Sequence, residues 1–274
     1  MSTSQPIESE MSFWDHLDAL RKILFRIFAF VSIVAVVLFA YMKELFDVLI
    51  LAPTRNDFFV YKWLNDLSKT LPILPDFVIG EFHVKIININ LSSQFFIHMS
   101  TSFYFALVLS FPFVIYQFFL FVKPALYANE RKNAGMAFLG GNLLFYIGLA
   151  VGYVMVFPLT LRFLAGYQLS TYIENSVSLD SYMDSFLMLC FIMGLVFELP
   201  LLSWFLSQMG ILNRGFFNKF RKHAIVILLI IAAFITPSSD PFTLMVVFLP
   251  IYMLWELSAL VVKPKPAETI ENEE

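Results

Sequence analysis

The sequence predicts an all-α, polytopic membrane protein with six transmembrane helices, and three observations lead to this class. First, 59% of the 274 residues are hydrophobic, and the mean hydropathy is +0.76. Second, only 14% of the residues are charged, whereas a soluble domain usually carries about 25%. Third, the apolar residues gather in six runs, and a helix that crosses a bilayer needs about 20 mainly apolar residues.

The six runs are expected to form the transmembrane helices, and they cover residues 23–42, 95–122, 136–161, 182–209, 224–236 and 242–262. The fifth run is short: about 13 residues reach only about 20 Å as a helix, against about 30 Å of hydrocarbon. Either this helix begins in the polar stretch before it, or the bilayer thins there. A short buried or re-entrant helix is the competing interpretation. Proline inside four of the runs predicts kinked helices: Pro112, Pro158, Pro200 and Pro250.

Positive charges predict the orientation of these helices. Six spans place both termini on the same side of the membrane. Most of the 18 lysines and arginines lie before the first run, between the second and third, between the fourth and fifth, and after the last. The positive-inside rule places these segments, and therefore both termini, in the cytoplasm.

Three regions follow from this arrangement. Residues 1–22 are expected to form a cytoplasmic amphipathic segment, because the apolar residues at 13, 14, 17 and 20 recur at helical spacing. Their polar and acidic start does not resemble a cleavable signal peptide. Residues 23–262 are expected to form the membrane domain, and residues 263–274 a disordered cytoplasmic tail. The outer loop, 43–93, is expected to contain a short amphipathic helix over 58–71 and a short strand over 81–86.

Catalytic and metal-binding motifs are missing from the sequence. It contains no glycine-rich phosphate loop, no serine nucleophile elbow and no zinc-binding helix motif. The four histidines are scattered, and the single cysteine, Cys190, excludes an intramolecular disulfide and a cysteine-rich metal site. The net charge of −3 argues against binding to nucleic acid. We therefore expect no enzymatic activity, no metal and no cofactor.

Two carboxyl groups lie inside the predicted spans, Glu198 in the fourth and Glu256 in the sixth. An ionisable group there costs on the order of 2–3 kcal/mol, so it should face protein or water. Glu198 is interpreted as a functional carboxyl that faces a ligand or water, with a protonated or hydrogen-bonded structural glutamate as the alternative. Glu256 lies nearer the cytoplasmic end, where a residue that reaches interfacial water is the simpler interpretation.

Several segments together resemble, in order, the motifs of the TatC family, the receptor subunit of the twin-arginine protein translocase. Residues 16–22 (HLDALRK) resemble the family's HLxELR motif, and residues 197–200 (FELP) resemble its FExP motif. Residues 112–117 (PFVIYQ) and 121–131 (FVKPALYANER) resemble its second span and the loop after it. Further matching positions are Pro53, Tyr153, Thr236, Pro237 and Glu256. The similarity extends from about residue 12 to residue 262.

The resemblance implies a function. Members of this family bind the twin-arginine signal peptides of folded proteins at the cytoplasmic face of the bacterial inner membrane. Within the bilayer they form a concave bundle of kinked helices. They assemble as homo-oligomers with TatA- and TatB-like single-span subunits, and they export the cargo using the proton-motive force.

The resemblance also implies which residues bind the signal peptide. Glu130 matches the family's signal-binding glutamate, which suits a pair of guanidinium groups because these form paired bonds with carboxylates. Phe121, Leu126 and Arg131 lie in the same motif, and Arg21 lies in the N-terminal one.

One position departs from the family pattern. The family's second glutamate is replaced here by Ala19, and Asp18 precedes it. One position around a helix is a rotation of about 100°, so we hypothesise that Asp18 substitutes partially for the glutamate. Glu198 is expected deeper in the bundle, where the apolar part of the signal or a partner helix rests. Five residues are expected at structural or partner interfaces: Pro53, Tyr153, Thr236, Pro237 and Glu256.

The main alternative function is a proton-coupled secondary transporter. It would account for Glu198 and for the proline-broken spans. It would also predict an internal repeat between the two halves of the chain. The spans and loops of the two halves differ in length, so the sequence favours the translocase receptor.

Overall fold

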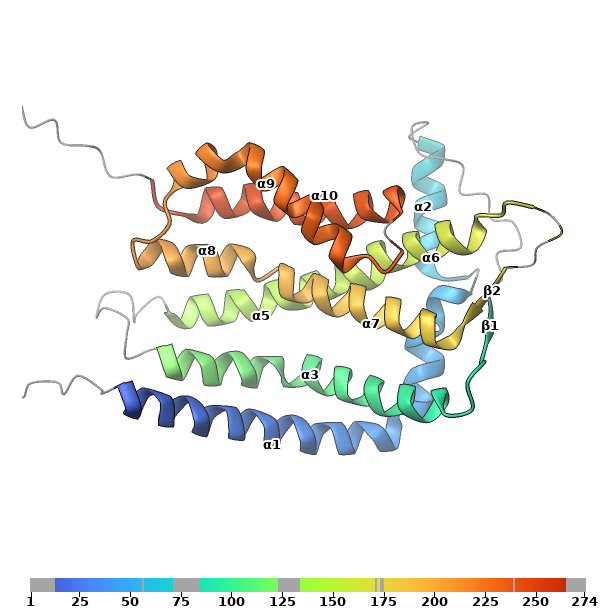
Figure 1. The fold of residues 1–274 in the computed structure, drawn as a ribbon, viewed down its shortest axis with the longest axis horizontal. Coiled ribbons are helices and arrows are strands. Elements are labelled where there is room, and N and C mark those ends of the chain that lie inside the picture. The colour runs from blue at the N-terminus through green and yellow to red at the C-terminus, as the bar shows by residue number, and fades with distance from the viewer. Residues whose placement is uncertain are drawn as a thin grey trace, which may run out of the picture.

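Long helices that lie side by side dominate the fold (Figure 1). A computed structural model describes residues 13–55, 57–70, 84–122, 134–170, 172, 175–238 and 240–264. Within these ranges the long helices are α1 (Phe13–Leu45), α3 (Ser93–Val122), α5 (Ala134–Val151), α6 (Phe157–Gly166), α7 (Leu179–Val196), α8 (Leu199–Gln208), α9 (Arg214–Ile235) and α10 (Pro241–Val261). Helix α2 (Phe59–Thr70) stands across one end of the bundle, which we call the α2 end. The opposite end, where α1 begins, is the N-terminal end.

Five segments are long and apolar enough to cross a membrane: Leu17–Trp63, Ser93–Phe121, Phe138–Gly166, Leu179–Gln208 and Pro241–Val261. These confirm five of the six expected spans by length and composition. The remaining run forms part of α9, a helix of 22 residues whose first turns carry four cations. The helix therefore begins inside the polar stretch, as one of the two explanations for its shortness requires, and 22 residues reach about 33 Å. A sixth span at α9 remains a prediction.

Polar caps set the starts of three helices. The side chains of Ser178, Asn213 and Asp240 accept hydrogen bonds from the first turns of α7, α9 and α10, respectively. Each cap pairs a backbone N–H group that has no partner within its own helix. Because Asn213 caps α9 well before the apolar run that begins at residue 224, the helix includes the basic stretch between them.

Glycines allow α5 and α7 to pack closely. A Cβ atom added at Gly148 would lie 2.6 Å from the carbonyl oxygen of Met193 and 2.6 Å from the Cβ of Phe197. At Gly152, in the π-helical turn η4 (Gly152–Val156), an added Cβ would lie 2.8 Å from the Cα of Cys190. Small residues at such positions let backbones approach, which is how membrane helices gain contact where lipid offers no hydrophobic drive.

The chain after α1 forms a hydrogen-bonded turn at the α2 end. Helix α1 continues into a π-helical turn, η1 (Phe46–Ile50), and then a 3-10 turn, η2 (Ala52–Thr54). Carbonyl oxygens left open by these turns accept from three tyrosine hydroxyls: Tyr153 to Leu49 at 2.8 Å, Tyr182 to Ile50 at 2.5 Å and Tyr61 to Pro53 at 2.7 Å. These bonds tie the turn to η4, α7 and α2.

The predicted outer loop contains both expected elements. The amphipathic helix expected over 58–71 is confirmed as α2. The strand is β1 (Lys85–Ile87), which begins later than the expected segment 81–86, whose first three residues lie outside the described ranges. Its position is set by parallel pairing with β2 (Ser176–Ser178), in which Ile86 lies opposite Val177. No sequence pattern predicts this distant partner strand.

Candidate functional site

The residues of the N-terminal motif lie on the first turns of α1. Asp18 is exposed, and its carboxylate has no hydrogen bond or ion pair with any residue that the structure describes. Arg21, one turn further on, is also exposed, and its guanidinium carbon lies 5.7 Å from the centre of the Phe25 ring. Both side chains are therefore accessible to a ligand at the N-terminal end of the bundle.

The end of α3 lies beside the start of α1 (Figure 1). Helices α1 and α3 pack along their length, and the rings of Phe30 and Phe113 stack with their centres 4.3 Å apart. Since the two helices are antiparallel, this contact places Arg21 at the level of the last turn of α3, which contains the half-buried Phe121. The structure thus brings Asp18, Arg21 and Phe121 to one end of the molecule.

Three predicted signal-binding residues, Leu126, Glu130 and Arg131, lie outside the described ranges. In the sequence they fall between the end of α3 at Val122 and the start of α5 at Ala134. Their assignment to the site rests on the sequence resemblance.

Glu198 lies at the break between α7 and α8. The two helices are interrupted at residues 197 and 198, and Pro200, in the first turn of α8, has no N–H group to extend the hydrogen bonding of α7. The Glu198 side chain is only 7% exposed, and its Oε1 atom has no hydrogen-bond donor among the described residues. A buried carboxylate oxygen without a donor costs free energy, so the Glu198 carboxyl is suited to hold a proton or to accept a hydrogen bond from a group outside the described residues.

The carboxyl group of Glu198 packs against α5. A Cβ atom added at Gly141 would lie 3.1 Å from Oε2 and 3.6 Å from Oε1 of Glu198, and 2.5 Å from Leu201. Gly141 therefore makes room for both side chains. The motif analysis did not single out Gly141, because only the packing of α8 against α5 shows the need for a residue without a side chain there.

Two buried amide side chains, like Glu198, have an oxygen atom without a hydrogen-bond donor among the described residues. Gln117 on α3 is buried, and its Oε1 has no hydrogen-bond partner within the described ranges. Asn142 on α5 is also buried, and its Nδ2 donates to the carbonyl oxygen of Phe138 at 2.8 Å, which leaves Oδ1 unpaired. The sequence signal for both is a polar residue inside an apolar run. Gln117 entered the analysis only as part of a motif, and Asn142 was overlooked.

Glu256 forms an ion pair with Arg221, one of the cations between the fourth and fifth predicted spans. Arg221 on α9 donates from Nε to Oε1 at 2.6 Å and from Nη2 to Oε2 at 2.5 Å. Tyr252, one turn before Glu256 on α10, donates its hydroxyl to Oε1 at 2.7 Å. The Glu256 side chain is 32% exposed, and its partner comes from the neighbouring helix.

Pro53 and Tyr153 meet at the α2 end. Pro53 is buried, and its carbonyl oxygen accepts the hydroxyl of Tyr61. Tyr153 binds the backbone of η1, and its ring meets the Phe58 ring edge-on with centres 5.8 Å apart. Phe58 also contacts the ring of Tyr61, with centres 5.7 Å apart. Two motif residues that are distant in the sequence therefore belong to one packed cluster.

Thr236 and Pro237 form the connection between α9 and α10. Thr236 is buried and ends α9, and its N–H group donates to the carbonyl oxygen of Ala232 at 2.9 Å. Pro237 is exposed. Proline directly after a helix is common because it cannot continue the hydrogen-bond ladder.

A family model described as the Sec-independent protein translocase protein (TatC) matches residues 15–250. The chain belongs to the TatC family. Among the relatives of this TatC chain, the TatC protein of Blattabacterium sp. subsp. Periplaneta americana is 31% identical over 252 residues, which are 92% of this chain and 94% of the relative. The TatC protein of Koribacter versatilis is 30% identical over 266 residues, which are 96% and 90% of the two chains.

Two solved crystal structures of the twin-arginine translocase receptor TatC have the same fold. One superimposes on this TatC chain with a TM-score of 0.70 and 28% identity, and covers 90% of this chain and 97% of the other. The second, in the detergent DDM, gives a TM-score of 0.72 at 28% identity, with 90% and 99% covered. The chain is therefore a multi-pass membrane protein of the Tat translocase.

Proposed function

We propose that this TatC-family protein is the receptor and core subunit of a twin-arginine translocase. It binds twin-arginine signal peptides of folded proteins at the cytoplasmic face of a bacterial inner membrane. With TatA- and TatB-like single-span partners, and as a homo-oligomer within the complex, it exports the cargo using the proton-motive force. Solved TatC structures that are described as twin-arginine translocase receptors share its fold, and this likeness supports the proposal.

The observation that carries the proposal is the exposed carboxylate of Asp18, which has no hydrogen bond or ion pair with a described residue. It lies at the end of the bundle where α3 ends, and the segment with Glu130 begins there in the sequence. Arginine side chains of a signal peptide need carboxylates, because a guanidinium group donates two parallel hydrogen bonds to one carboxylate. Asp18 and Glu130 supply one acceptor for each arginine.

The other predicted site residues complete this interpretation. Phe121 and Leu126 provide apolar contact for the hydrophobic part of the signal. Arg21 and Arg131 would repel an arginine pair unless neutralised, so their proposed roles are to orient the carboxylates and to hold the membrane topology. In the orientation that the positive-inside rule predicts, the N-terminal end of the bundle lies in the cytoplasm.

Deeper in the bundle, Glu198 offers a hydrogen-bond acceptor to a signal peptide or a partner helix. Its Oε1 atom is buried without a donor among the described residues, so a polar group brought by a bound helix would gain a strong hydrogen bond. The residues proposed for structural or partner interfaces are Pro53, Tyr153, Thr236, Pro237 and Glu256.

A peptide-binding experiment tests the receptor proposal. The full-length protein in nanodiscs is titrated with a signal peptide that carries Arg-Arg and with its Lys-Lys counterpart. We expect the Arg-Arg peptide to bind about tenfold more tightly, which corresponds to one charge-assisted hydrogen bond. Glu130→Ala should remove this preference, and Asp18→Ala should weaken binding of the Arg-Arg peptide by about threefold to tenfold.

The control is Asp57→Ala, which removes an exposed carboxylate near α2 and should leave binding unchanged. Equal binding of the two peptides to the wild type would contradict the proposed recognition step. In that case the buried carboxyl of Glu198 would favour the alternative of a proton-coupled secondary transporter. Unchanged binding by Asp18→Ala would remove Asp18 alone from the site.

A further inference from the structure

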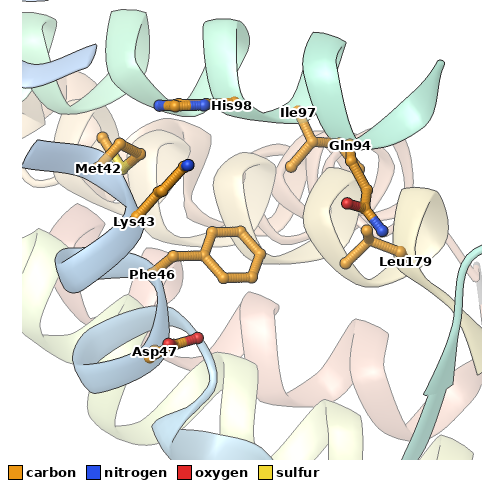
Figure 2. A pocket seen from close by; sticks show the side chains of 8 residues that line it. All are labelled: Met42, Lys43, Phe46, Asp47, Gln94, Ile97, His98 and Leu179. Atoms are coloured by element: carbon orange, nitrogen blue, oxygen red, sulfur yellow. The ribbon is translucent and has the colours of Figure 1, made fainter. Parts of the chain in front are cut away.

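A cavity of about 430 Å³ lies at the α2 end, between the end of α1 and the first residues of α3 and α7 (Figure 2). Its floor is apolar and buried, and includes Met42, Ile97 and Leu179. Its rim is polar and exposed, with a cation at Lys43, an anion at Asp47 and an amide at Gln94. A concave apolar floor with a few convergent polar groups is typical of a ligand site.

Two opposite charges lie on the rim of the cavity, at Lys43 and Asp47. Lys43 and Asp47 are four positions apart where α1 enters η1, a spacing that places side chains about 5–6 Å apart on a helical turn. Neither group has an ion pair or a side-chain hydrogen bond with another described residue. Figure 2 shows Lys43 and Phe46 projecting into the space from one wall, and Gln94 facing them from the other.

His98 forms a fixed wall of the cavity. Its Nε2 atom lies 2.8 Å from the carbonyl oxygen of Phe39, and since a carbonyl can only accept, Nε2 carries the hydrogen. The imidazole also stacks on the Phe39 ring, with centres 4.0 Å apart and planes at 7°. The cavity is therefore lined by a side chain that is already held in place, which lowers the entropy cost of binding.

The cavity lies where the apolar part of α1 ends. Lys43 is the first charged residue after Arg26, so it marks the boundary between the hydrocarbon and the headgroup region. Large apolar side chains are exposed on the neighbouring turns of both helices, among them Val36 and Val37 on α1 and Phe96 and Met99 on α3. A ligand with acyl chains would find apolar surface on one side of the cavity and charges on the other.

We propose that this cavity binds the headgroup of a zwitterionic phospholipid that carries a primary ammonium, such as phosphatidylethanolamine. Lys43 and Gln94 would bind the phosphate, and Asp47 would accept hydrogen bonds from the ammonium. A purely anionic headgroup would meet the Asp47 carboxylate, and a quaternary ammonium has no N–H group to donate to it. In the orientation given under Proposed function, the lipid belongs to the outer leaflet. The lipid site is separate from the signal-peptide site.

Lipid retention tests this proposal. The full-length protein is reconstituted with equal amounts of phosphatidylethanolamine, phosphatidylcholine and phosphatidylglycerol, then extracted in mild detergent, and bound lipids are counted by native mass spectrometry. We expect phosphatidylethanolamine to be retained about fivefold over the other two lipids. Lys43→Gln and Asp47→Asn should each reduce the ratio to that of the bulk lipid, and Lys43→Arg should preserve it.

Two exposed residues that do not line the cavity provide matched controls. Glu44→Gln removes the same charge as Asp47→Asn from the adjacent turn, and Lys62→Gln removes a lysine from α2; neither residue lines the cavity. Both should retain the preference. Binding of soluble phosphoethanolamine to the protein in phosphatidylcholine nanodiscs distinguishes a site for a water-soluble ligand from a site for a lipid.

The proposal is overturned by any of three results. The wild type shows no preference for phosphatidylethanolamine, or the cavity variants keep the preference of the wild type. The third is tight binding of soluble phosphoethanolamine by itself, which would make the cavity a site for a water-soluble ligand. Failure of the soluble compound to bind supports a lipid that is held by both its headgroup and its chains.

Discussion

Arg221 on α9 and Glu256 on α10 form a two-point ion pair, with Nε–Oε1 at 2.6 Å and Nη2–Oε2 at 2.5 Å. An arginine side chain keeps its positive charge at every relevant pH, so Arg221 always offers a charged donor to Glu256. The pair joins the two helices where α9 passes from its basic first turns into its apolar run.

The first prediction concerns this pair. Arg221→Gln and Glu256→Gln should each lower the midpoint of thermal unfolding in detergent. The double variant should be no less stable than the worse single variant, because both changes remove the same interaction. Lys222→Gln is the control, since Lys222 is exposed and has no ion pair with a described residue. Fully additive losses would show that the two residues act independently.

The second prediction concerns the contact between α5 and α7. Gly148→Ala should destabilise the protein by about 1–3 kcal/mol, because its Cβ atom would lie 2.6 Å from the backbone of Met193 and the two helices must move apart. Gly140→Ala is the matched control, since an added Cβ atom there meets nothing within 4 Å. Alanine at that position should be neutral or stabilising by up to about 1 kcal/mol. Equal stability of the two variants, measured by chemical or thermal unfolding, would contradict the packing described above.

The third prediction concerns the tyrosine hydroxyls at the α2 end. Tyr153→Phe and Tyr182→Phe should each cost about 0.5–1.5 kcal/mol, since each leaves a carbonyl oxygen of η1 without its donor. Tyr172→Phe should have no effect on stability, because the Tyr172 side chain is 97% exposed. Amide hydrogen exchange should become faster in η1 in the first two variants. An unchanged exchange rate there would show that the hydroxyls do not hold the turn.

The fourth prediction concerns the cap of α10 and its pH dependence. Asp240 accepts the N–H of Thr243 at 2.8 Å and the hydroxyl of Ser238 at 2.6 Å. Burial acts to raise the pKa of Asp240, but these hydrogen bonds outweigh it and hold the pKa below the ordinary value of 3.8. A lowered pKa in the folded state means that the stabilisation is fully present above pH 3.8 and is lost as the pH falls through the folded-state pKa.

Asp240→Ala should therefore cost about 1 kcal/mol at neutral pH. The difference in stability between this variant and the wild type should shrink in strong acid. Asp240→Asn keeps a capping oxygen and should remove the pH dependence while it retains most of the stability. The measurement is the unfolding midpoint of the three proteins across the acid range. If the difference between the unfolding midpoints of Asp240→Ala and the wild type does not change with pH, the charge of Asp240 contributes nothing to stability.

Much of the fold followed from the sequence because the signals for it are local. An apolar run long enough to cross a bilayer has few stable alternatives to a helix, since its backbone groups must pair within the segment. The spacing of apolar residues, which is also a local signal, predicts helix α2. The sequence does not decide where α9 begins. Asn213 is a favourable cap, but the first turns after it lack the apolar residues that mark a membrane helix.

The site was predicted less completely. The order of the family motifs identified Asp18, Arg21 and Glu198 as candidates, and the structure adds that Asp18 is exposed and Glu198 is buried against α5. No local signal could pair Glu256 with Arg221, which lies 35 residues away, or show that Gly141 makes room for Glu198. Each of these depends on how two helices are rotated about their axes when they pack.

The sequence by itself determined the class of protein, the five apolar spans that the structure contains and the family to which the chain belongs. These properties depend on composition, run length and ordered motifs, which a reader can obtain one segment at a time. Only the tertiary structure decided which groups lie together: the tyrosine hydroxyls on η1, the ion pair between α9 and α10, and the charged rim of the cavity beside His98. Such contacts join residues that are far apart in the chain, and their energies depend on distances that exist only after the helices have packed.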